Sequence, residues 1–171
     1  KGDGLFGGDM LPGQMAADDL FAALKPLLED SSVRKVGHEI KRDMEVLSLF
    51  GVALAGIDDV QLLSYAFESG LVSQALPALS ERHLGHSLPD LREVAGSGRS
   101  LPKFNSLPLE RAAPYAGEVV DVMFRLGQLL RGKLLRARKV TVYGTLERPL
   151  VPVLTEMELA GVLIDPALLK K

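Results

Sequence analysis

Only two segments of this chain have the pattern of a β-strand, and this shortage of strands is the feature that most constrains the fold. Residues 33–37 (VRKVG) form a short segment with two β-branched residues, and residues 52–60 (VALAGIDDV) form a second one. Two strands alone leave both edges of a sheet unpaired and cover little apolar surface. We therefore expect an α/β fold dominated by helices, whose sheet needs strands that these segments do not supply.

The rest of the chain is dominated by helical periodicity, in which apolar residues recur every three or four positions. Most of the helical segments end at a glycine, the residue preferred just beyond a helix C-terminus. Asp18 or Asp19 is placed to cap the first helix, and Pro114 stands where the longest helix is expected to begin. The predicted helices cover residues 17–30, 39–51, 60–70, 73–85, 114–139 and 148–161.

Charge and composition narrow the classes of function. The 20 basic and 22 acidic residues give a formal charge of −2, so binding to nucleic acid would need a local basic patch. The absence of cysteine excludes disulfides and thiolate metal sites. No apolar run approaches the ~20 residues of a membrane span, and no signal peptide pattern opens the chain. We therefore expect a cytoplasmic protein without a membrane partner.

Several distinctive segments occur in a characteristic order, among them KVGHEIKRDMEVL, GIDDVQLLSYAFESG, YAGEVVDVMFRL and RPLVPVLTEMELAG. This order resembles the 3′–5′ exonuclease domain of bacterial DNA polymerase I. The resemblance implies a ribonuclease H-like fold around a mixed five-stranded sheet, and this chain has no counterpart of the first three strands, so the fold is expected to be truncated. We expect a flexible glycine-rich lead-in over 1–16, an exonuclease-like domain over 17–143 and the start of a polymerase domain over 144–171.

One motif bears directly on metal binding. The family resembled here cleaves the terminal phosphodiester with two divalent ions, Mg²⁺ or Mn²⁺, which converging carboxylates hold. Its second motif is Asn-x-x-Tyr/Phe-Asp, and the corresponding residues are Glu39-Ile40-Lys41-Arg42-Asp43. Asp43 matches the metal ligand, whereas Glu39 would repel a phosphate backbone and Arg42 replaces a stacking aromatic ring. The simpler interpretation of Asp43 is a carboxylate that the helix dipole favours near a helix start.

The other carboxylate motifs of the family are not matched. The only Asp-x-Glu is DME at 43–45, on a predicted helix, where residues two positions apart point in different directions. The Tyr-x-x-x-Asp motif appears as YAGEV, which keeps Tyr115 but places Val119 at the ligand position. Glu118 and Asp121 lie about 100° and about 200° around the helix from that position, so neither replaces the ligand. The apolar stripe predicted for this helix is Tyr115, Val119, Val122, Leu126 and Leu129.

Other polar groups are weaker candidates for a site. His83 and His86 flank Gly85, which is expected to end a helix, so we interpret both histidines as structural. The basic run RGKLLRARK over 131–139 is interpreted as a solvated helix end, with contacts to DNA phosphates as the alternative. The nucleic-acid contacts that the resemblance marks as candidates are Lys41, Arg42, Phe104 and Asn105.

The sequence therefore predicts a degenerate exonuclease-like domain that acts as a scaffold beside a polymerase domain in cis, in a protein of bacterial DNA replication and repair. Asp43, with Tyr115, is what remains of the catalytic set, so we expect neither nuclease activity nor a cofactor in this chain. The implied partner is DNA, as a single-stranded 3′ end or as primer–template. Two alternatives stay open: an active two-metal exonuclease completed by an upstream segment, and a non-catalytic single-stranded DNA-binding domain.

Overall fold

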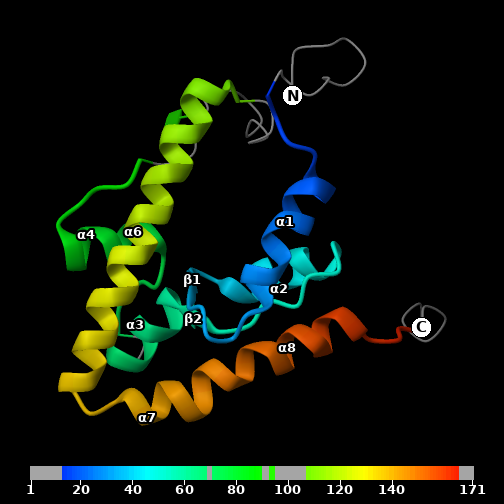
Figure 1. Ribbon diagram of the computed structural model, residues 1–171. Coiled ribbons are helices and arrows are strands. Elements are labelled where there is room, and N and C mark those ends of the chain that lie inside the picture. The colour runs from blue at the N-terminus through cyan, green and yellow to red at the C-terminus, as the bar shows by residue number, and fades with distance from the viewer. Residues whose placement is uncertain (1–12, 69–70, 90–92, 95–106, 166–171) are drawn as a thin grey trace.

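The computed structural model describes residues 13–68, 71–89, 93–94 and 107–165. The long helix α6 (Leu109–Arg136) and the C-terminal helix α8 (Arg148–Ala160) meet at an angle, and a small sheet lies in the corner between them (Figure 1). This arrangement confirms the expected helix-dominated α/β fold. None of the helices in the described part of the chain has the length and apolar character that a membrane-spanning helix requires.

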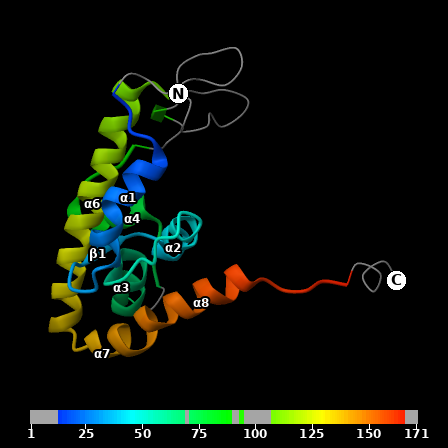
Figure 2. The ribbon, with the colours of Figure 1, turned by 45° about the vertical axis from the view of Figure 1, so that its right-hand side comes forward.

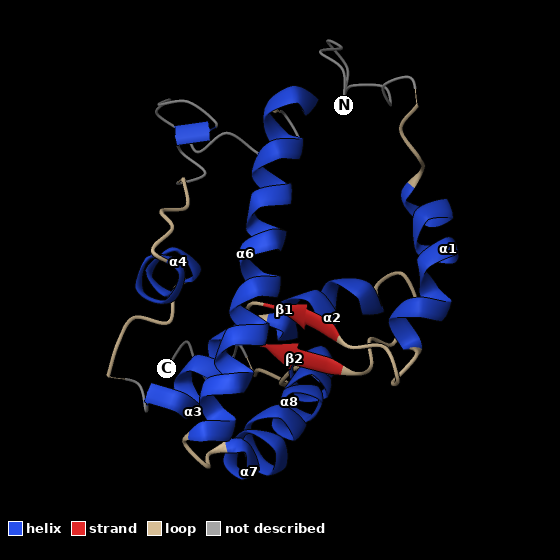
Figure 3. Cartoon of the chain, turned by 60° about the vertical axis from the view of Figure 1, so that its left-hand side comes forward, coloured by secondary structure: helices blue, strands red, loops and turns tan. Residues whose placement is uncertain are grey.

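The sheet consists of two parallel strands, β1 (Lys35–Gly37) and β2 (Ile57–Asp59), joined through the helix α2 (Ile40–Ser48). Val36 pairs with Asp58 in the centre of the sheet. Figure 3 shows the two strands side by side in red, with both arrowheads pointing toward α6. All three residues of β2 are buried, whereas only one residue of β1 is. The described residues contain no further strand, and the expected truncation of a ribonuclease H-like fold stays a prediction.

The larger core lies where α6 packs against α3 (Val60–Glu68) and α4 (Leu76–Leu84). Leu63 of α3 and Leu79 of α4 are fully buried against it. The predicted stripe of α6 was wrong at its end, because Leu130 rather than Leu129 continues the buried face. The buried apolar side chains of this face are Val122, Leu126, Leu130 and Leu134.

Two helix starts differ from the prediction. The long helix begins at Leu109, so Pro114 lies inside it rather than at its first position. Pro114 is the sixth residue of the helix, so the helix lacks the hydrogen bond that an N–H at this position would donate to the carbonyl oxygen of Glu110. The N-cap of α1 (Ala17–Glu29) is Ala16, without a side-chain cap. Asp18 and Asp19 lie instead in the first turn, where the helix dipole favours acidic side chains.

The C-terminal part of the fold is one helical run from Val140 to Ala160. It passes through α7 (Val140–Val142) and the π-helical η2 (Tyr143–Glu147) before it becomes α8. α8 packs against α2, and a second, smaller core forms there from Ile40, Ile57 and Val151. Figure 2 shows α8 below α2 in this arrangement. The predicted domain boundary at 143/144 falls inside the helical run and stays a prediction.

The N-terminal helix α1 has no buried residue and is attached through one aromatic contact and several polar ones. The ring centroids of Phe21 and Phe50 lie 4.2 Å apart, and Lys25 Nζ donates to the carbonyl oxygen of Gly51 at 2.6 Å. Lys35 Nζ donates hydrogen bonds to the carbonyl oxygens of Leu27 (3.3 Å) and Asp30 (2.6 Å). The N–H of Ala55 donates to the carbonyl oxygen of Leu28 at 3.0 Å. The position of α1 therefore depends on contacts with β1 and with the loop that leads into β2.

Candidate functional site

Asp43 lies in the first turn of α2, shortly after the end of β1. The backbone turns between these elements at Glu39, which has a left-handed conformation with φ of 56°. The turn brings the carboxylate beside Gly37, where a Cβ atom would lie 3.3 Å from Asp43 Oδ2 and 3.1 Å from Ile40 Cγ1. The missing side chain at Gly37 thus makes room for Asp43 at the end of the strand.

Asp43 lines a hollow of about 340 Å³ between β1, α2 and the end of α1. It is the one acidic side chain among the described residues around this hollow, and the others are mostly apolar, such as Leu28, Val46 and Leu54. Divalent ions such as Mg²⁺ need several oxygen ligands in a defined geometry. The immediate surroundings of Asp43 therefore supply one ligand and few candidates for the others.

The electrostatic surroundings favour the protonated form of Asp43. Burial raises the pKa of this carboxyl, and the neighbouring carboxylate of Asp59 raises it further, while Arg42 and His38 act in the opposite direction. Asp59 itself is already engaged: Oδ2 accepts the N–H of Ile40 at 2.9 Å, and Oδ1 accepts the first N–H groups of α3. The second acid that acts on Asp43 is therefore committed to holding the starts of two helices.

The residues around Asp43 on α2 make their own ion pairs. Lys41 pairs with Glu158 and so links α2 to α8. Arg42 pairs with Glu39 at 3.6 Å, and its side chain is 77% exposed. Of these two candidate DNA contacts, Arg42 is the one whose charge lies largely in solvent. The remaining candidates, Phe104 and Asn105, lie outside the described residues.

The third motif lies on α6, where Val119 packs against the larger core. The acids on either side of it have partners elsewhere: Glu118 Oε1 lies 2.8 Å from His86 Nε2, and Asp121 Oδ2 lies 3.4 Å from Arg125 Nη1. Tyr115 lies about one turn before Val119 on the same helix. The helix face that carries the motif thus contributes apolar packing, and its acids serve surface contacts.

These residues do not fit a centre of two divalent ions. In the part of the chain that the structure describes, no three His, Cys, Asp or Glu side chains are grouped so that they would hold a metal ion. A two-metal centre needs several converging carboxylates. Among the described residues, Asp59 is the one further carboxylate that acts on Asp43, and both of its oxygens accept backbone hydrogen bonds.

Asp58 on β2 was not among the predicted site residues, and its side chain is 1% exposed. The Nη1 atoms of Arg34 and Arg148 lie 3.4 and 3.8 Å from its Oδ1, and that of Arg131 lies 2.9 Å from its Oδ2. The hydroxyl of Tyr143 donates to Oδ1 at 3.0 Å. Burial and this carboxylate raise the pKa of Tyr143, so the phenol keeps its proton. The pair of consecutive acids Asp58 and Asp59 in a predicted strand was the feature of the sequence that could have indicated this network.

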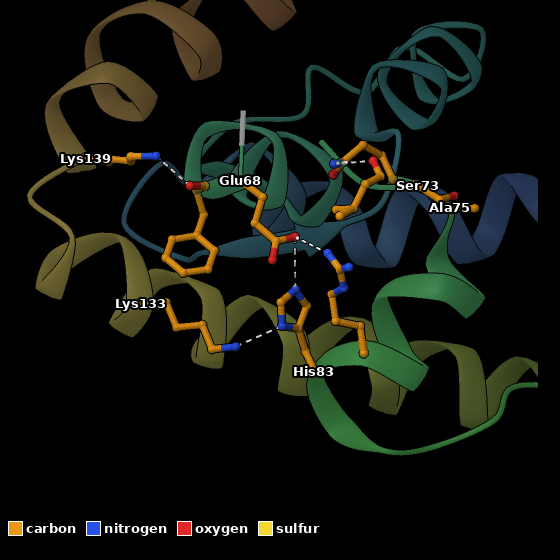
Figure 4. A network of polar contacts seen from close by, with 10 residues as sticks. Glu68, Ser73, Ala75, His83, Lys133 and Lys139 are labelled. Atoms are coloured by element: carbon orange, nitrogen blue, oxygen red, sulfur yellow. Dashed lines mark hydrogen bonds and ion pairs between the residues drawn. The ribbon is translucent and has the colours of Figure 1, made fainter. Parts of the chain in front are cut away.

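A second overlooked network joins α3, α4 and α6 (Figure 4). Lys133 Nζ donates to His83 Nδ1 at 2.8 Å, and His83 Nε2 lies 3.7 Å from a carboxylate oxygen of Glu68. Burial, followed by the charge of Lys133, lowers the pKa of His83. Lys139 Nζ donates to the carbonyl oxygen of Phe67 at 2.6 Å. These contacts agree with a structural interpretation of His83. They also give Lys133 and Lys139, two residues of the basic run 131–139, partners within the fold.

Comparison with known proteins adds a second line of evidence. A family model described as a 3′–5′ exonuclease matches residues 3–135. The chain is 38% identical over 167 residues to DNA polymerase I of Rhizobium leguminosarum, and 39% identical over 163 residues to DNA polymerase I of Pseudomonas aeruginosa. These matches cover 98% and 93% of this chain, but the chain spans only 16% and 18% of the length of the two relatives.

Proposed function

The chain belongs to the 3′–5′ exonuclease family of DNA polymerase I, and from this premise we propose that it is a degenerate member without nuclease activity. In this proposal it is a segment of a DNA polymerase I-type protein of replication and repair, and it acts as a scaffold beside a polymerase domain in cis. DNA is then the partner of the whole protein, in the bacterial cytoplasm.

The observation that carries the proposal is the packing of Val119. The Tyr-x-x-x-Asp motif of the family requires an acid at this position, and here an apolar side chain contacts the larger core. A carboxylate there would support a divalent ion, whereas a valine supplies no ligand atom. Glu118 and Asp121 are held by His86 and Arg125, which favours a loss of the ligand rather than its displacement by one residue.

The surroundings of Asp43 support the same conclusion. Asp59 is the one further carboxylate that acts on Asp43 among the described residues, and both of its oxygens already accept backbone N–H groups. Two divalent ions need more carboxylate ligands than this pair supplies. The ions of the family, Mg²⁺ or Mn²⁺, are therefore not expected to bind as a pair in this chain.

The scaffold role rests on contacts that connect the sheet to the C-terminal helix. Lys41 of α2 pairs with Glu158 near the end of α8, and Arg148 at its start lies 3.8 Å from the buried Asp58. Val151 fills the smaller core between these two points. α8 is thus fixed to the exonuclease-like part near both of its ends, as a rigid connection between two domains would require.

The second candidate is an active exonuclease completed by an upstream segment. It is favoured by one observation: β1 pairs only with β2 among the described residues, and Asp43 lines a hollow close to β1. A strand added at the free edge of β1 would bring further side chains close to Asp43. Val119 argues against this candidate, because the missing third ligand lies within the present chain.

The nuclease proposal is tested by incubating the chain, and a longer version that includes its neighbouring segments, with a 5′-labelled single strand and Mn²⁺. We expect no shortening from the 3′ end by either protein. Shortening that disappears in Asp43→Ala but persists in Asp121→Ala would overturn the proposal, because Asp121 is an exposed acid paired with Arg125. The same strand with a fluorescent label tests binding without cleavage, which would weaken steeply with added salt.

A further inference from the structure

We propose that Arg34, Arg131 and Arg148 form a phosphate-binding site over the buried carboxylate of Asp58. The three guanidinium groups come from three separate parts of the chain: the segment before β1, the last third of α6 and the first turn of α8. Each has a nitrogen within 4 Å of Asp58. The proposal does not rest on the proposed function, because it concerns different residues from Asp43 and would hold in an active nuclease as well.

The cluster has an excess of positive charge. Asp58 carries one negative charge, and the structure pairs none of the three arginines with a second carboxylate among the residues it describes. One arginine would be enough to neutralise Asp58, which also accepts a hydrogen bond from Tyr143. The two remaining positive charges have no counter-charge in the described fold and are available to an anion.

The arginines also have donors to spare. All three approach Asp58 through Nη1, and their side chains are 39%, 50% and 36% exposed. A guanidinium carries five N–H donors in a planar fork that matches the oxygen geometry of phosphate. The contact with Asp58 therefore orients the three groups, while their other N–H groups remain open to solvent. Side chains held in place in this way lose less conformational entropy when a ligand binds.

A hollow of about 470 Å³ adjoins the cluster, and the side chains that line it suit a phosphate-bearing ligand. Arg34 and Arg148 both line it, together with Ser31, and no acidic side chain is among the described residues around it. Arg131 lines a neighbouring hollow with Asp58 and Arg148, so its contribution is to compensate Asp58 and to add to the positive charge. Apolar side chains, including Met44 and Leu54, form the remainder. The guanidinium groups would hold the phosphate, and the apolar part would contact a sugar or a base. The hollow has the size of a small-molecule site.

The ligand class is therefore a nucleotide phosphate, supplied either by a free mononucleotide or by the backbone of a single strand. The experiment titrates the isotope-labelled 171-residue chain with three probes at constant ionic strength: inorganic phosphate, a deoxynucleoside 5′-monophosphate and a short oligothymidylate. Amide chemical shifts in the nuclear magnetic resonance spectrum report binding residue by residue. We expect saturable shifts at Ser31, Arg34 and Arg148 with at least one probe.

The three probes distinguish the sources of the phosphate. Tighter binding of the mononucleotide than of inorganic phosphate assigns a nucleotide site, and affinity that rises with oligonucleotide length assigns contacts to a DNA backbone. Equal binding of all three assigns a site for the phosphate group alone. Each of these results supports the proposal, and the absence of saturable shifts at the cluster with every probe overturns it.

Variants separate this site from general charge attraction. Arg34→Gln combined with Arg148→Gln should weaken binding of the best probe at least tenfold. The matched control is Arg125→Gln, because Arg125 lies on the same helix as Arg131, is also 50% exposed and pairs with a carboxylate at 3.4 Å. We expect the control to change affinity less than twofold.

Equal losses in the double variant and in the control would contradict the proposal. If the double variant does not fold, Arg34→Gln alone decides, because two guanidinium groups still compensate Asp58. In that case the proposal requires a loss of at least threefold in affinity with an unchanged melting temperature. None of these results depends on whether the chain cleaves DNA.

Discussion

The two strands of the sheet are fixed to the long helix by different interactions. β1 meets α6 through apolar packing, and Gly127 lies so close that a Cβ there would be 2.7 Å from Val36 Cγ1. β2 is linked to α6 by charge, through Asp58 and Arg131 at 2.9 Å. One strand therefore depends on shape complementarity, and the other depends on compensation of a buried carboxylate.

Two acids near these strands also differ, Asp58 in the middle of β2 and Asp43 in the first turn of α2, after β1. Asp58 is buried among three guanidinium groups and a phenol, whereas Asp43 is affected by burial and by another carboxylate. Cations and hydrogen-bond donors around a carboxyl group stabilise its ionised form, whereas a neighbouring carboxylate destabilises that form. The two acids therefore differ in how many groups converge on them, and our proposal of a degenerate site rests on the small number of carboxylates near Asp43.

The largest expected effect is that of Asp58→Ala, which leaves three arginines and Tyr143 without their common partner. The buried hydroxyl of Tyr143 then lacks its acceptor, whereas the arginines are partly exposed and can be rehydrated, so we expect a loss of about 2–3 kcal/mol of unfolding free energy. Asp43→Ala should stay within about 0.5 kcal/mol of the wild type, because the favourable charges of Arg42 and His38 are opposed by burial and by Asp59. Urea unfolding followed by circular dichroism measures both, and similar losses in the two variants would break the comparison.

Tyr143→Phe should have the next largest effect. The hydroxyl donates to Asp58 and accepts the N–H of Asp59 at 3.0 Å. Its removal leaves the buried N–H of Asp59 without this acceptor and takes one donor from Asp58 Oδ1, which keeps its contact with Arg34. A loss of about 2 kcal/mol is expected from such an unpaired group. Tyr65→Phe is the control, because Tyr65 is 47% exposed, and its unfolding free energy should hardly change. Equal losses of unfolding free energy in the two variants would show that the hydroxyl of Tyr143 does not stabilise β2 through Asp58 and Asp59.

The packing of β1 is tested by Gly127→Ala. The new methyl group would meet the stiff β-branched side chain of Val36, which costs more than the roughly 1 kcal/mol gained in helix propensity. We expect a net loss of about 1 kcal/mol. Gly132→Ala on the same helix should instead stabilise by about 0.5–1 kcal/mol, since the nearest atom is Arg136 Nη2 at 3.6 Å. If thermal unfolding shows that both variants are stabilised, or that both are destabilised, the close packing of Gly127 against Val36 is contradicted.

The smallest effect is expected for Asp43→Asn, and it depends on pH. The folded state raises the pKa of Asp43 above its ordinary value of 3.8, so the folded protein binds this proton more tightly than the unfolded chain. The resulting stability is present below that value and is lost as the pH rises through the folded pKa. The asparagine variant should therefore match the wild type at low pH and be slightly more stable at pH 7. A lower stability at pH 7 would mean that ionised Asp43 has a favourable partner.

The local elements were predictable from the sequence, because each depends on residues close together in the chain. Both strands occur within the predicted segments, and α2, α4 and α8 follow the predicted periodicity. Gly85 ends α4 in the left-handed conformation (φ 63°) that was expected of it. Asp43 lies near a helix start for the same reason.

The interactions that distinguish the two strands could not be predicted in this way. Asp58 meets Arg131 and Arg148, which are more than 70 positions away, and only the folded chain brings them together. The closeness of Gly127 to Val36 likewise depends on how α6 crosses the sheet. The start of α6 was misplaced because proline is favoured at the first helical position, whereas the helix begins five residues earlier and continues through Pro114 without one backbone hydrogen bond.

The most direct test of the central claim is a titration of the chain with Mn²⁺, followed by the electron paramagnetic resonance signal of the free ion. An acid without converging partners should take up no pair of ions, and uptake should be millimolar or weaker and unchanged by Asp43→Asn. Two ions per chain with micromolar affinity, both lost in Asp43→Asn but retained in Asp121→Asn, would contradict the account.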